Sequence, residues 1–448
     1  MYVSASLNLA ICYPRKGERP HCQIRADRLG FLPRVAVGAV LVAALGSASQ
    51  VAEAACSSTF PVTTFDIASP NAVPAQNYYP LGTGSSLNAL ISTFNTVNTS
   101  FLAGSSAFVG APADSKPSQP GGGAWTRVIT GNVDTNAVTT STIGSPDNGT
   151  GTCNGTVHQE YTGLQVGLDT MTRNLPSGAN IHIGVTGGYI SAHSEDRTPE
   201  LAYDRFNVSV SSGGRPGVRG SGTEIRPVVH FLSPAGSLKT DTEAVFLGFY
   251  GAYTQGNFFA DATVRADYYN MSLNDPNANL FDGRLNAFGA AIAGNMGYRV
   301  PIFSQWFIEP SVGASLAKAW VLDKIDVPGA AVVVDQPTVR NDGTVTVDEV
   351  TSILGRGSLR VGANVPAGSW IWQPFATASV FHEFAGEATA NADGLRTSTE
   401  RIGTFYQFGL GSSVVMGDSG WLAYSRVDYR TGDNTEGLGV HTGIRYHW

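Results

Sequence analysis

The sequence lacks long apolar runs and has few charged residues. Only 14% of its 448 residues are charged, whereas a soluble domain commonly has about 25%. Beyond the amino-terminal region, no stretch reaches the roughly 18 consecutive apolar residues that a membrane-crossing helix needs. These two absences argue against an ordinary soluble domain and against a helical membrane protein.

Cysteine is scarce, and an excess of basic residues is absent. The chain has 4 cysteines and a formal net charge of -7, so the charge balance gives no reason to expect a nucleic-acid partner. Glycine is abundant by contrast, with 53 residues against a usual share of about 7%. Low charge with many glycine and aromatic residues favours alternating strands over a helical bundle.

The amino terminus is predicted to be a targeting segment. An apolar run at 35–46 follows several arginines and is too short to span a membrane, which is typical of a signal-peptide core. Small residues place the expected cleavage before Ala55, so 1–54 is predicted to be a Sec-type signal peptide. Cys56 and Cys153 then remain as an even pair in an oxidising compartment.

The region after the expected cleavage site has two parts. Residues 55–84 are rich in Ser, Thr, Pro and Asn without periodicity, and they are predicted to be a short leader or passenger remnant. From Ser85 to Leu102 the apolar residues recur near helical spacing, which predicts a helix. We therefore expect a helix and linker at 85–121, followed by a barrel domain at 122–448.

The remainder of the chain contains twelve candidate strands. Most have the roughly 9–11 residues that a tilted membrane strand needs, or somewhat more. The candidates are Ala124–Asp134, Tyr161–Thr170, Asn180–Ala192, Glu243–Thr254, Phe258–Tyr269, Leu285–Val300, Trp306–Val321, Ser352–Val365, Trp370–Glu387, Gly403–Met416, Trp421–Arg430 and Gly437–Trp448.

The connections between these candidates alternate in length. Those after even-numbered candidates are short, as at Gln255–Asn257 and Gly417–Gly420, whereas most others are long, as at Thr135–Glu160, His193–Thr242 and Leu322–Thr351. Short periplasmic turns and long extracellular loops are the rule for outer-membrane barrels. The pattern therefore predicts an all-β fold, a 12-stranded antiparallel transmembrane β-barrel.

The last candidate strand, Gly437–Trp448, alternates bulky with small or polar residues and ends in aromatics. Period-two alternation indicates a strand with two different faces, apolar toward lipid and polar toward the lumen. We expect Tyr446 and Trp448 to be part of the signal that directs assembly into the outer membrane, and Trp448 to seal the barrel beside its first strand.

Charged residues alternate with apolar ones within several candidate strands. An Arg or Lys facing lipid at the midplane costs roughly 2–4 kcal/mol, so these charges are predicted to face the lumen and to pair there around the helix. The predicted lumen charges are Asp261, Arg265, Asp267, Glu309, Arg356, Arg360, Arg426, Asp428 and Arg445.

A series of motifs, in this order and ending at the chain terminus, resembles the autotransporter β-domain of bacterial outer membranes. The resemblance covers about 122–448. The segments that carry it include Ala124–Gly131, Thr162–Asp169, Ile183–Tyr189, Leu247–Tyr253, Asn295–Val300, His382–Phe384, Tyr429–Gly432 and Gly443–Trp448.

The resemblance implies a twelve-stranded pore plugged by an N-terminal α-helix, which fits Ser85–Leu102. It also implies type V secretion or display of an amino-terminal passenger at the cell surface of a Gram-negative bacterium. The partners expected are outer-membrane lipid and lipopolysaccharide, the barrel-assembly machinery, periplasmic chaperones, and a host or surface ligand of unknown identity. No cofactor is expected.

A typical passenger is long and repetitive, whereas 55–84 is short and has no repeats. We therefore expect the long loops, especially His193–Thr242 and Leu322–Thr351, to carry the outward-facing function. The sequence predicts a surface-displayed structural or adhesive protein rather than an enzyme. The alternatives are a pore-type transporter and a barrel hydrolase.

Two motifs could carry hydrolase or metal chemistry. Gly417–Gly420 resembles the segment around serine-protease nucleophiles, but its Asp, Ser and Gly are also turn residues, and a triad is recognised by geometry. Adjacent strand residues point to opposite faces, so His382 and Glu383 cannot bind one metal together. A hydrolase would require Ser419, His382 and His441 to act together; we predict no catalytic and no metal site.

The cysteines are candidates for a disulfide. Loop parity places Cys153 at the extracellular end, and a helix entering the pore from outside would leave Cys56 near the same end. We expect a Cys56–Cys153 bridge, with two free thiols as the alternative, because spacing alone never proves connectivity.

Overall fold

The chain divides into two compact units, Met1–Val51 and Ala52–Trp448. In this computed structural model, every described residue belongs to the second unit. The expected signal peptide at 1–54 and most of the expected leader lie outside the described residues. The structure describes residues 56–58, 89–99, 121–143, 149–172, 178–197, 202–203, 207–211, 224–228, 231–232, 237–275, 280–303, 305–327, 331–333, 338–340, 343–392 and 395–448.

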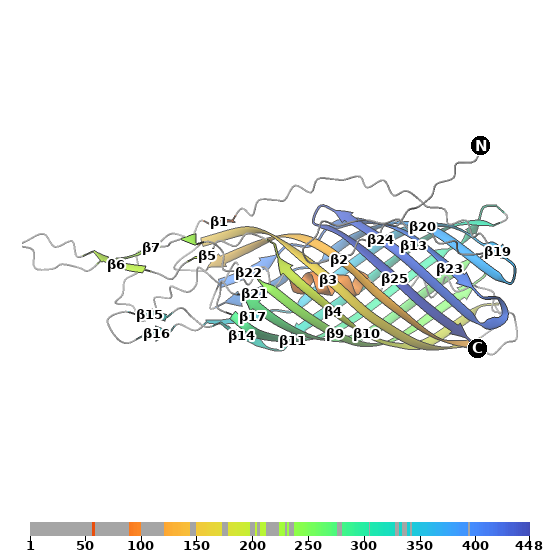
Figure 1. Ribbon diagram of the computed structural model, residues 1–448, viewed down its shortest axis with the longest axis horizontal. Helices are drawn as coiled ribbons and strands as arrows, with labels where there is room; N and C mark the ends of the chain where they lie inside the picture. The colour runs from red at the N-terminus through yellow and green to blue at the C-terminus, as the bar shows by residue number, and fades with distance from the viewer. Residues whose placement is uncertain are drawn as a thin grey trace, which may run out of the picture. The chain divides into compact units, whose positions relative to one another are not determined.

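Twelve long antiparallel strands form a closed barrel (Figure 1). Each pairs with the next along the chain, and the last returns to the first, with His447 opposite Gly123 and Thr435 opposite Thr135. The prediction of a 12-stranded all-β barrel is therefore confirmed. The barrel strands are β2 (Gly121–Ile143), β3 (Gly149–Thr172), β4 (Asn180–Asp196), β9 (Lys239–Gln255), β10 (Phe258–Asp275), β11 (Leu280–Tyr298), β13 (Trp306–Val321), β18 (Val350–Ala363), β20 (Trp370–Ala385), β23 (Thr404–Val415), β24 (Trp421–Gly432) and β25 (Thr435–His447).

Short elements lie between and beyond the barrel strands. One end, where β19 and the carboxyl terminus lie, is called the short-turn end, and the opposite end is called the long-loop end (right and left in Figure 1). The short elements are β1 (Cys56–Ser58), β5 (Ala202–Tyr203), β6 (Asn207–Ser211), β7 (Glu224–Val228), β8 (Phe231–Leu232), β12 (Val300–Pro301), β14 (Lys324–Val327), β15 (Ala331–Val333), β16 (Thr338–Arg340), β17 (Gly343–Val347), β19 (Val365–Ala367), β21 (Ala388–Ala392), β22 (Leu395–Thr399) and the 3-10 helix η2 (Gly417–Ser419).

The strands present an apolar outer face and a polar inner face. In β10, Val264 is 54% exposed on the outside while Arg265, its neighbour, is 4% exposed on the inside. Leu247 and Phe249 of β9 are likewise outward and more than half exposed. A closed barrel satisfies all its backbone hydrogen bonds between strands, so such a surface can lie in lipid. None of the described helices is long and apolar enough to cross a membrane.

The first hairpin differs from the expectation of a loop at Thr135–Glu160. β2 and β3 continue as a paired ladder until Ile143 lies opposite Gly149. The Thr-, Val- and Asn-rich sequence of this hairpin has the composition of a loop, but its Thr and Val residues suit a pleated strand once a partner lies alongside. The prediction of an open loop was therefore wrong for most of this segment.

At the long-loop end, β2 exchanges one partner for another. β25 pairs with β2 only as far as Thr135, and beyond that point β22 takes its place, with Thr399 opposite Thr139. β21 pairs with β22 on one side and with β17 on the other, where Ala390 lies opposite Val347. The β21–β22 hairpin therefore continues the sheet past the short turn between β24 and β25.

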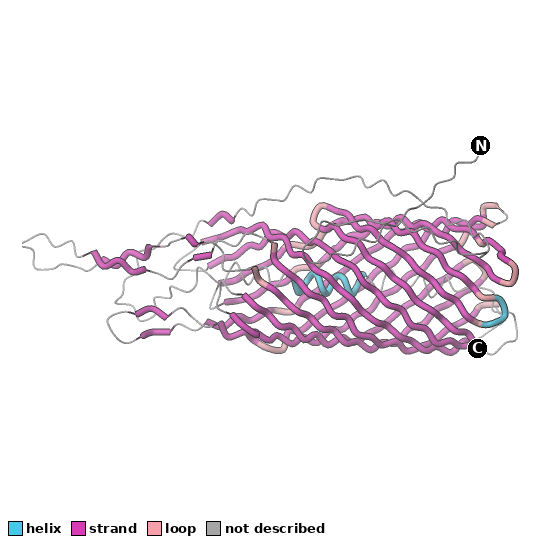
Figure 2. Tube along the Cα trace, viewed as in Figure 1, coloured by secondary structure: helices cyan, strands magenta, loops and turns pink. Residues whose placement is uncertain are grey.

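A helix at 89–99 lies inside the barrel (cyan in Figure 2). Every one of its residues is buried, because the strands surround it on all sides. The predicted pore helix is confirmed for these residues, and the remainder of the expected Ser85–Leu102 segment lies outside the described part of the chain.

Candidate functional site: the plugged lumen

The helix packs its apolar side chains into a core near the long-loop end. Leu90 and Phe94 are each 1% exposed, and they share one hydrophobic cluster with residues of β10, β17 and β21. The ring centroids of Phe94 and Tyr269 are 6.0 Å apart. Burying a Leu or Phe side chain stabilises a fold by about 1.5–3 kcal/mol, so this cluster holds the helix in place.

The polar side of the helix is bound by Gln159 of β3, which is fully buried. Its carboxamide oxygen accepts hydrogen bonds from Ser92 Oγ at 3.2 Å and Thr96 Oγ1 at 3.0 Å. Its Nε2 donates to Thr93 Oγ1 at 2.6 Å and to Ser194 Oγ at 3.1 Å. A single barrel side chain thus uses both ends of its amide to hold three helix residues.

Two helix asparagines contact the opposite wall. Ser352 Oγ lies 3.2 Å from Asn95 Oδ1 and 3.0 Å from Glu383 Oε1, and its one hydroxyl hydrogen can be donated to either oxygen. Nearer the helix carboxyl end, an Arg265 guanidinium N–H donates to Asn98 Oδ1. The helix is therefore bonded to β3, β10 and β18, which lie on different sides of the lumen.

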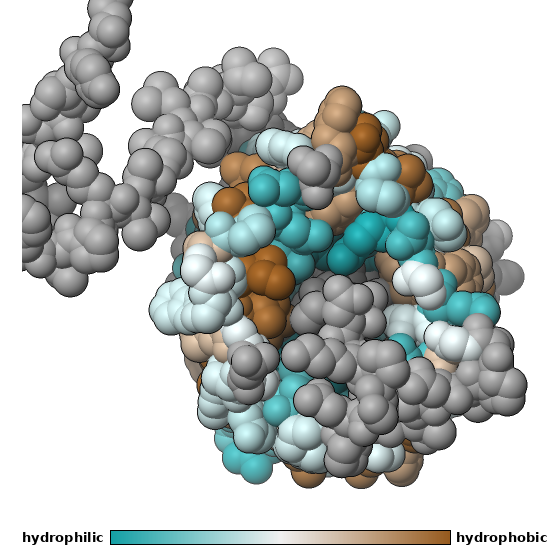
Figure 3. All heavy atoms as spheres, turned by 90° about the vertical axis from the view of Figure 1, so that its right-hand side faces the viewer, coloured by the Kyte–Doolittle hydropathy of each residue, from teal (hydrophilic) through white to brown (hydrophobic). Residues whose placement is uncertain are grey.

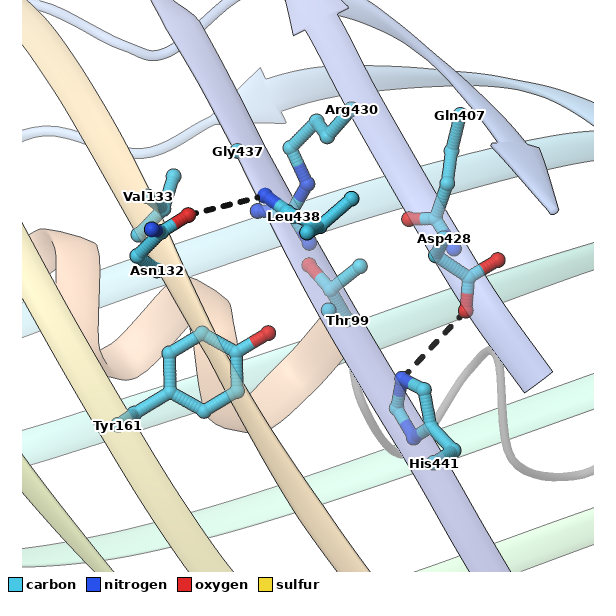
Figure 4. Close-up of a pocket in the computed structure, with 11 residues that line it drawn as sticks. Thr99, Asn132, Val133, Tyr161, Gln407, Asp428, Arg430, Gly437, Leu438 and His441 are labelled. Atoms are coloured by element: carbon cyan, nitrogen blue, oxygen red, sulfur yellow. Dashed lines mark hydrogen bonds and ion pairs between the residues drawn. The ribbon is translucent and has the colours of Figure 1, made fainter. Parts of the chain in front are cut away.

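A small polar cavity lies at the carboxyl end of the helix (Figure 4). Its volume is about 20 Å³, which is enough for roughly one water molecule. Thr99 closes one side, Tyr161 another, and His441 Nε2 lies 3.5 Å from Asp428 Oδ2. The lumen is tightly filled here.

Most of the predicted lumen charges lie in ion pairs or hydrogen bonds on the inner face. Arg265 Nε lies 2.8 Å from Asp267 Oδ1, and Arg426 Nη2 lies 2.6 Å from Asp428 Oδ1. Both pairs join residues two apart on one strand, which share a face.

A second group of charges involves an arginine that the sequence analysis did not select. Glu309 lies between Arg299 Nη2 at 2.7 Å and Arg360 Nη1 at 3.7 Å. Arg360 also lies over the Phe375 ring, 4.0 Å from its centroid. Arg299 sits just past the end of β11, where the period-two pattern no longer indicates a face.

Asp261 and Arg356 are connected through an intervening amide. Arg356 Nη2 donates to Asn295 Oδ1 at 2.8 Å, and Asn295 Nδ2 donates to Asp261 Oδ1 at 3.2 Å. Because the amide both accepts and donates, it joins a cation and an anion that sit on β18 and β10.

The partner of Arg445 is Asp169, which the sequence analysis did not select. Arg445 Nη2 donates to Asp169 Oδ1 at 2.8 Å, and Tyr250 OH donates to Asp169 Oδ2 at 2.7 Å. Trp125 Nε1 in turn donates to Tyr250 OH at 2.9 Å. These four residues come from β25, β3, β9 and β2, so the network bonds the closing seam of the barrel to its neighbours near the short-turn end.

The chain terminus lies against the first barrel strand. Tyr446 is opposite Ala124 of β2, and its ring centroid is 4.9 Å from that of Trp421. Trp448 N donates to the carbonyl oxygen of Gly122 at 3.3 Å. The two residues predicted as an assembly signal thus lie at the barrel seam.

The candidate cysteines lie in two paired strands. β1 pairs antiparallel with β3, and Cys56 is the register partner of Cys153.

The residues weighed for hydrolase chemistry lie apart on different elements. Ser419 is in the η2 turn, where its Oγ donates to the carbonyl of Met416 at 2.5 Å. His382 is exposed on the outer face and bonds Thr404, whereas His441 is buried in the lumen. Glu383 faces inward, opposite to its neighbour. Among the described residues, no three His, Cys, Asp or Glu side chains are grouped as metal ligands would be.

Seen from the short-turn end, hydrophilic residues gather around the hollow in the middle of the face (Figure 3). This distribution agrees with the buried arginines and acids of the inner wall. In the described part of the chain, the lumen wall is charged and hydrogen-bonded and encloses the helix at 89–99.

Comparison with known proteins finds similarity over part of the barrel. Residues 124–323 match the model of the family described as Autotransporter beta-domain. The pertactin autotransporters of Bordetella parapertussis and Bordetella bronchiseptica are each 28% identical over 212 residues, which is 46% of this chain and 22% of the relative. The chain thus spans about a fifth of the length of these relatives.

Solved structures of similar chains include the beta domain of the Bordetella autotransporter BrkA, with 20% identity, a TM-score of 0.44, and coverage of 72% of this chain and 98% of that one. The transport unit of AIDA-I from Escherichia coli has 15% identity, a TM-score of 0.48, and coverage of 82% and 99%. The part of the closed 12-stranded barrel that spans 124–323 is thus similar to the Autotransporter beta-domain family.

Proposed function

We propose that this outer-membrane barrel is a closed display unit without catalytic activity. Its lumen is filled by its own helix, and its long-loop end presents a structural or adhesive surface to the outside of the cell. In this function the barrel anchors the chain that precedes the helix, and the extended hairpins at the long-loop end make contact with a surface ligand.

The observation that carries this proposal is the complete burial of the helix at 89–99. Gln159 bonds three of its residues, and apolar side chains of the strands enclose the rest. A pore that conducts solutes needs an open, water-filled path, whereas this lumen is occupied along the helix.

The long-loop end supplies the surface. β21 and β22 bury Ala388, Ala390 and Thr397 completely, so the protruding sheet has packed interior positions of its own. A rigid extension of this kind suits contact with a ligand better than flexible loops, because less conformational freedom is lost on binding.

The environment follows from the fold. The apolar outer face lies in outer-membrane lipid, beside lipopolysaccharide in the outer leaflet. Periplasmic chaperones and the barrel-assembly machinery are the proposed partners during insertion, since an amphipathic barrel strand exposes apolar residues until the barrel closes.

Conductance in planar lipid bilayers tests the closed lumen. The full chain is expected to pass little current, and deletion of 85–102 is expected to raise the conductance several-fold while heat-modifiable gel mobility shows that the barrel still folds. Deletion of residues 207–228, which carry β6 and β7, is the control, because no described residue of this segment belongs to the hydrophobic cluster that holds the helix. An open channel in the full chain would favour the pore-type transporter instead.

Epitope insertion tests the orientation. An epitope at the turn of Asp433 and Asn434 is expected to be labelled by antibody on intact cells, because this turn joins β24 to β25 at the long-loop end. The same epitope at Gly256 and Asn257, the turn between β9 and β10, is expected to be labelled only after the outer membrane is permeabilised. The reverse pattern would invert the proposed topology.

The barrel-hydrolase alternative has its own test. Ester and peptide substrates are offered to the full chain and to a variant with Ser419→Ala, His382→Ala and His441→Ala. Because His382 lies on the outer face, His441 in the lumen and Ser419 in the η2 turn, no activity that depends on all three is expected. A hydrolysis rate lost in the triple variant would support the enzyme and contradict the proposal.

A further inference from the structure

The strand β1 lies on an edge of β3 that β4 does not reach. Pairing between β4 and β3 ends where Asp196 lies opposite Val157. Farther toward the long-loop end, β3 pairs with β1, with Cys153 opposite Cys56 and Gly151 opposite Ser58. The leader thus adds a short strand to the first hairpin, with 3 residues in β1.

The register matches the geometry of a disulfide. In an antiparallel pair, residues directly opposite each other have Cα atoms roughly 4.5–5.5 Å apart, and disulfides join Cα atoms about 4.4–6.8 Å apart. The sequence has 4 cysteines, and the expected signal peptide contains Cys12 and Cys22. The two cysteines that remain are Cys56 and Cys153, which are also opposite each other in the β1–β3 ladder. The cysteine count and the strand register therefore point to the same pair independently.

We propose that Cys56 and Cys153 form an intramolecular disulfide that fastens the leader to the first hairpin outside the lumen. Two thiols lose two protons and two electrons and form one S–S bond. A disulfide-bearing thiol oxidase of the oxidising compartment accepts them by exchange and leaves as its dithiol.

The bridge attaches the leader covalently to the first hairpin. The helix at 89–99 is continuous with β2 on its carboxyl side, and the bridge fixes the chain on its amino side. The closed ring then contains the helix and the whole of β2. Residues 57–88 separate Cys56 from the helix and are too long a segment to fix the helix itself, so the bridge fixes the position of the leader. This inference goes beyond the display function and does not depend on it.

Peptide mapping of the full chain in outer membranes tests the bridge. Free thiols are first blocked with N-ethylmaleimide, and the chain is then digested without reductant. A cross-linked pair of peptides containing Cys56 and Cys153 is expected, and reduction should split it. Unreduced protein that labels fully at both cysteines, or a cross-link to a second copy of the chain, would overturn the proposal.

Moving the cysteines tests the register. Ser57 is opposite Thr152, so the variant C56S/S57C/T152C/C153T is expected to restore a bridge at the neighbouring facing pair. The mismatched variant C56S/S57C, which keeps Cys153, is expected to lose most of the cross-linked peptide. Equal cross-linking in the two variants would mean that the ladder does not hold the leader, and the proposal would fail.

A folding control keeps this test decisive. Cys56→Ser and Cys153→Ser each leave one free thiol, and both are expected to keep heat-modifiable mobility, because the barrel closes through β2 and β25 without the leader. Limited protease digestion of intact cells then reports the attachment of the leader, and the leader is expected to be cut several-fold faster in either variant. Unchanged cleavage, with the bridge mapped in the parent chain, would show that the bridge does not fasten the leader and would overturn that part of the proposal.

Discussion

The backbone amide of Trp448 donates a hydrogen bond of 3.3 Å to the carbonyl of Gly122. A side chain at Gly122 has no room, because its Cβ would lie 2.7 Å from Trp448 Nε1 and 2.8 Å from the carbonyl oxygen of Asp169. The last residue of the chain and the start of the first strand therefore fit together at the seam of the barrel.

Deletion of Tyr446–Trp448 is expected to prevent closure, because it removes the end of β25 that faces Gly123 and Ala124. Periplasmic aggregate or degraded protein is expected, as measured by the yield in purified outer membranes. Gly122→Val is expected to lower that yield more mildly, while Gly251→Ala is the control, since its Cβ would meet nothing nearer than 3.7 Å. An unchanged yield after the truncation would refute a role for the terminus in assembly.

The inner and outer faces can be distinguished by single cysteine labels. A quencher confined to the bilayer is expected to reach a fluorophore at Val264→Cys or Val427→Cys, which are 54% and 44% exposed on the outer face. It is expected to miss labels at Arg265→Cys and Arg426→Cys, which are 4% and 9% exposed. These experiments are done in a C56S/C153S background. Quenching of the second pair but not of the first would invert the assignment.

Gln159→Leu is expected to loosen the helix. The change keeps the volume but removes the amide that bonds Ser92, Thr93 and Thr96, and each buried polar group left without a partner costs about 1–3 kcal/mol. The matched control is Gln165→Leu on the same strand, because Gln165 is equally buried but bonds Thr186 on the wall. Protease access to the helix and bilayer conductance are the measurements.

Protease access to the helix and bilayer conductance should both rise in Gln159→Leu. In Gln165→Leu they should stay near the values of the parent chain. A similar rise in the two variants would show that general barrel stability, and not the helix bonds, had been measured.

The barrel could be predicted from the sequence because its signal is local. The period-two alternation that places Arg265 and Asp267 on one face, with Val264 and Ala266 on the other, recurs in other barrel strands such as β9 and β25. Strand number and the closed antiparallel order then followed from counting the candidates. The structure agrees because lipid offers no hydrogen-bond partners to the backbone. Each backbone N–H and C=O group of a strand must therefore be hydrogen-bonded within the barrel.

The partners across the lumen could not be predicted, because they depend on long-range register. Gln159 and Asp169 lie on β3, and the helix and Arg445 reach them only after the barrel has closed. Nothing in their own sequence neighbourhood distinguishes them from other inward residues. The exchange of β25 for β22 alongside β2 was missed for the same reason, since it joins Thr139 to Thr399.

Asp169→Asn is expected to destabilise the barrel strongly. Asp169 carries the negative charge that faces Arg445, and it accepts a hydrogen bond from Tyr250. Both charged side chains of the pair are almost completely buried. Removing one partner of a buried pair typically costs about 3–5 kcal/mol, because an uncompensated charge remains in the interior.

The control is Arg284→Ala, which breaks the exposed pair with Asp282, whose side chains are 74% and 69% exposed. Exposed ion pairs contribute roughly 0–1 kcal/mol to stability, so this variant should unfold at a temperature close to that of the parent chain. The temperature at which the heat-modifiable band converts is the measurement, and it should fall clearly only for Asp169→Asn. Replacing both partners, with Asp169→Leu and Arg445→Met, should recover part of the loss, because no unpaired charge is then buried. If the double variant is no more stable than Asp169→Asn, the network contributes through packing and not through the charge pair.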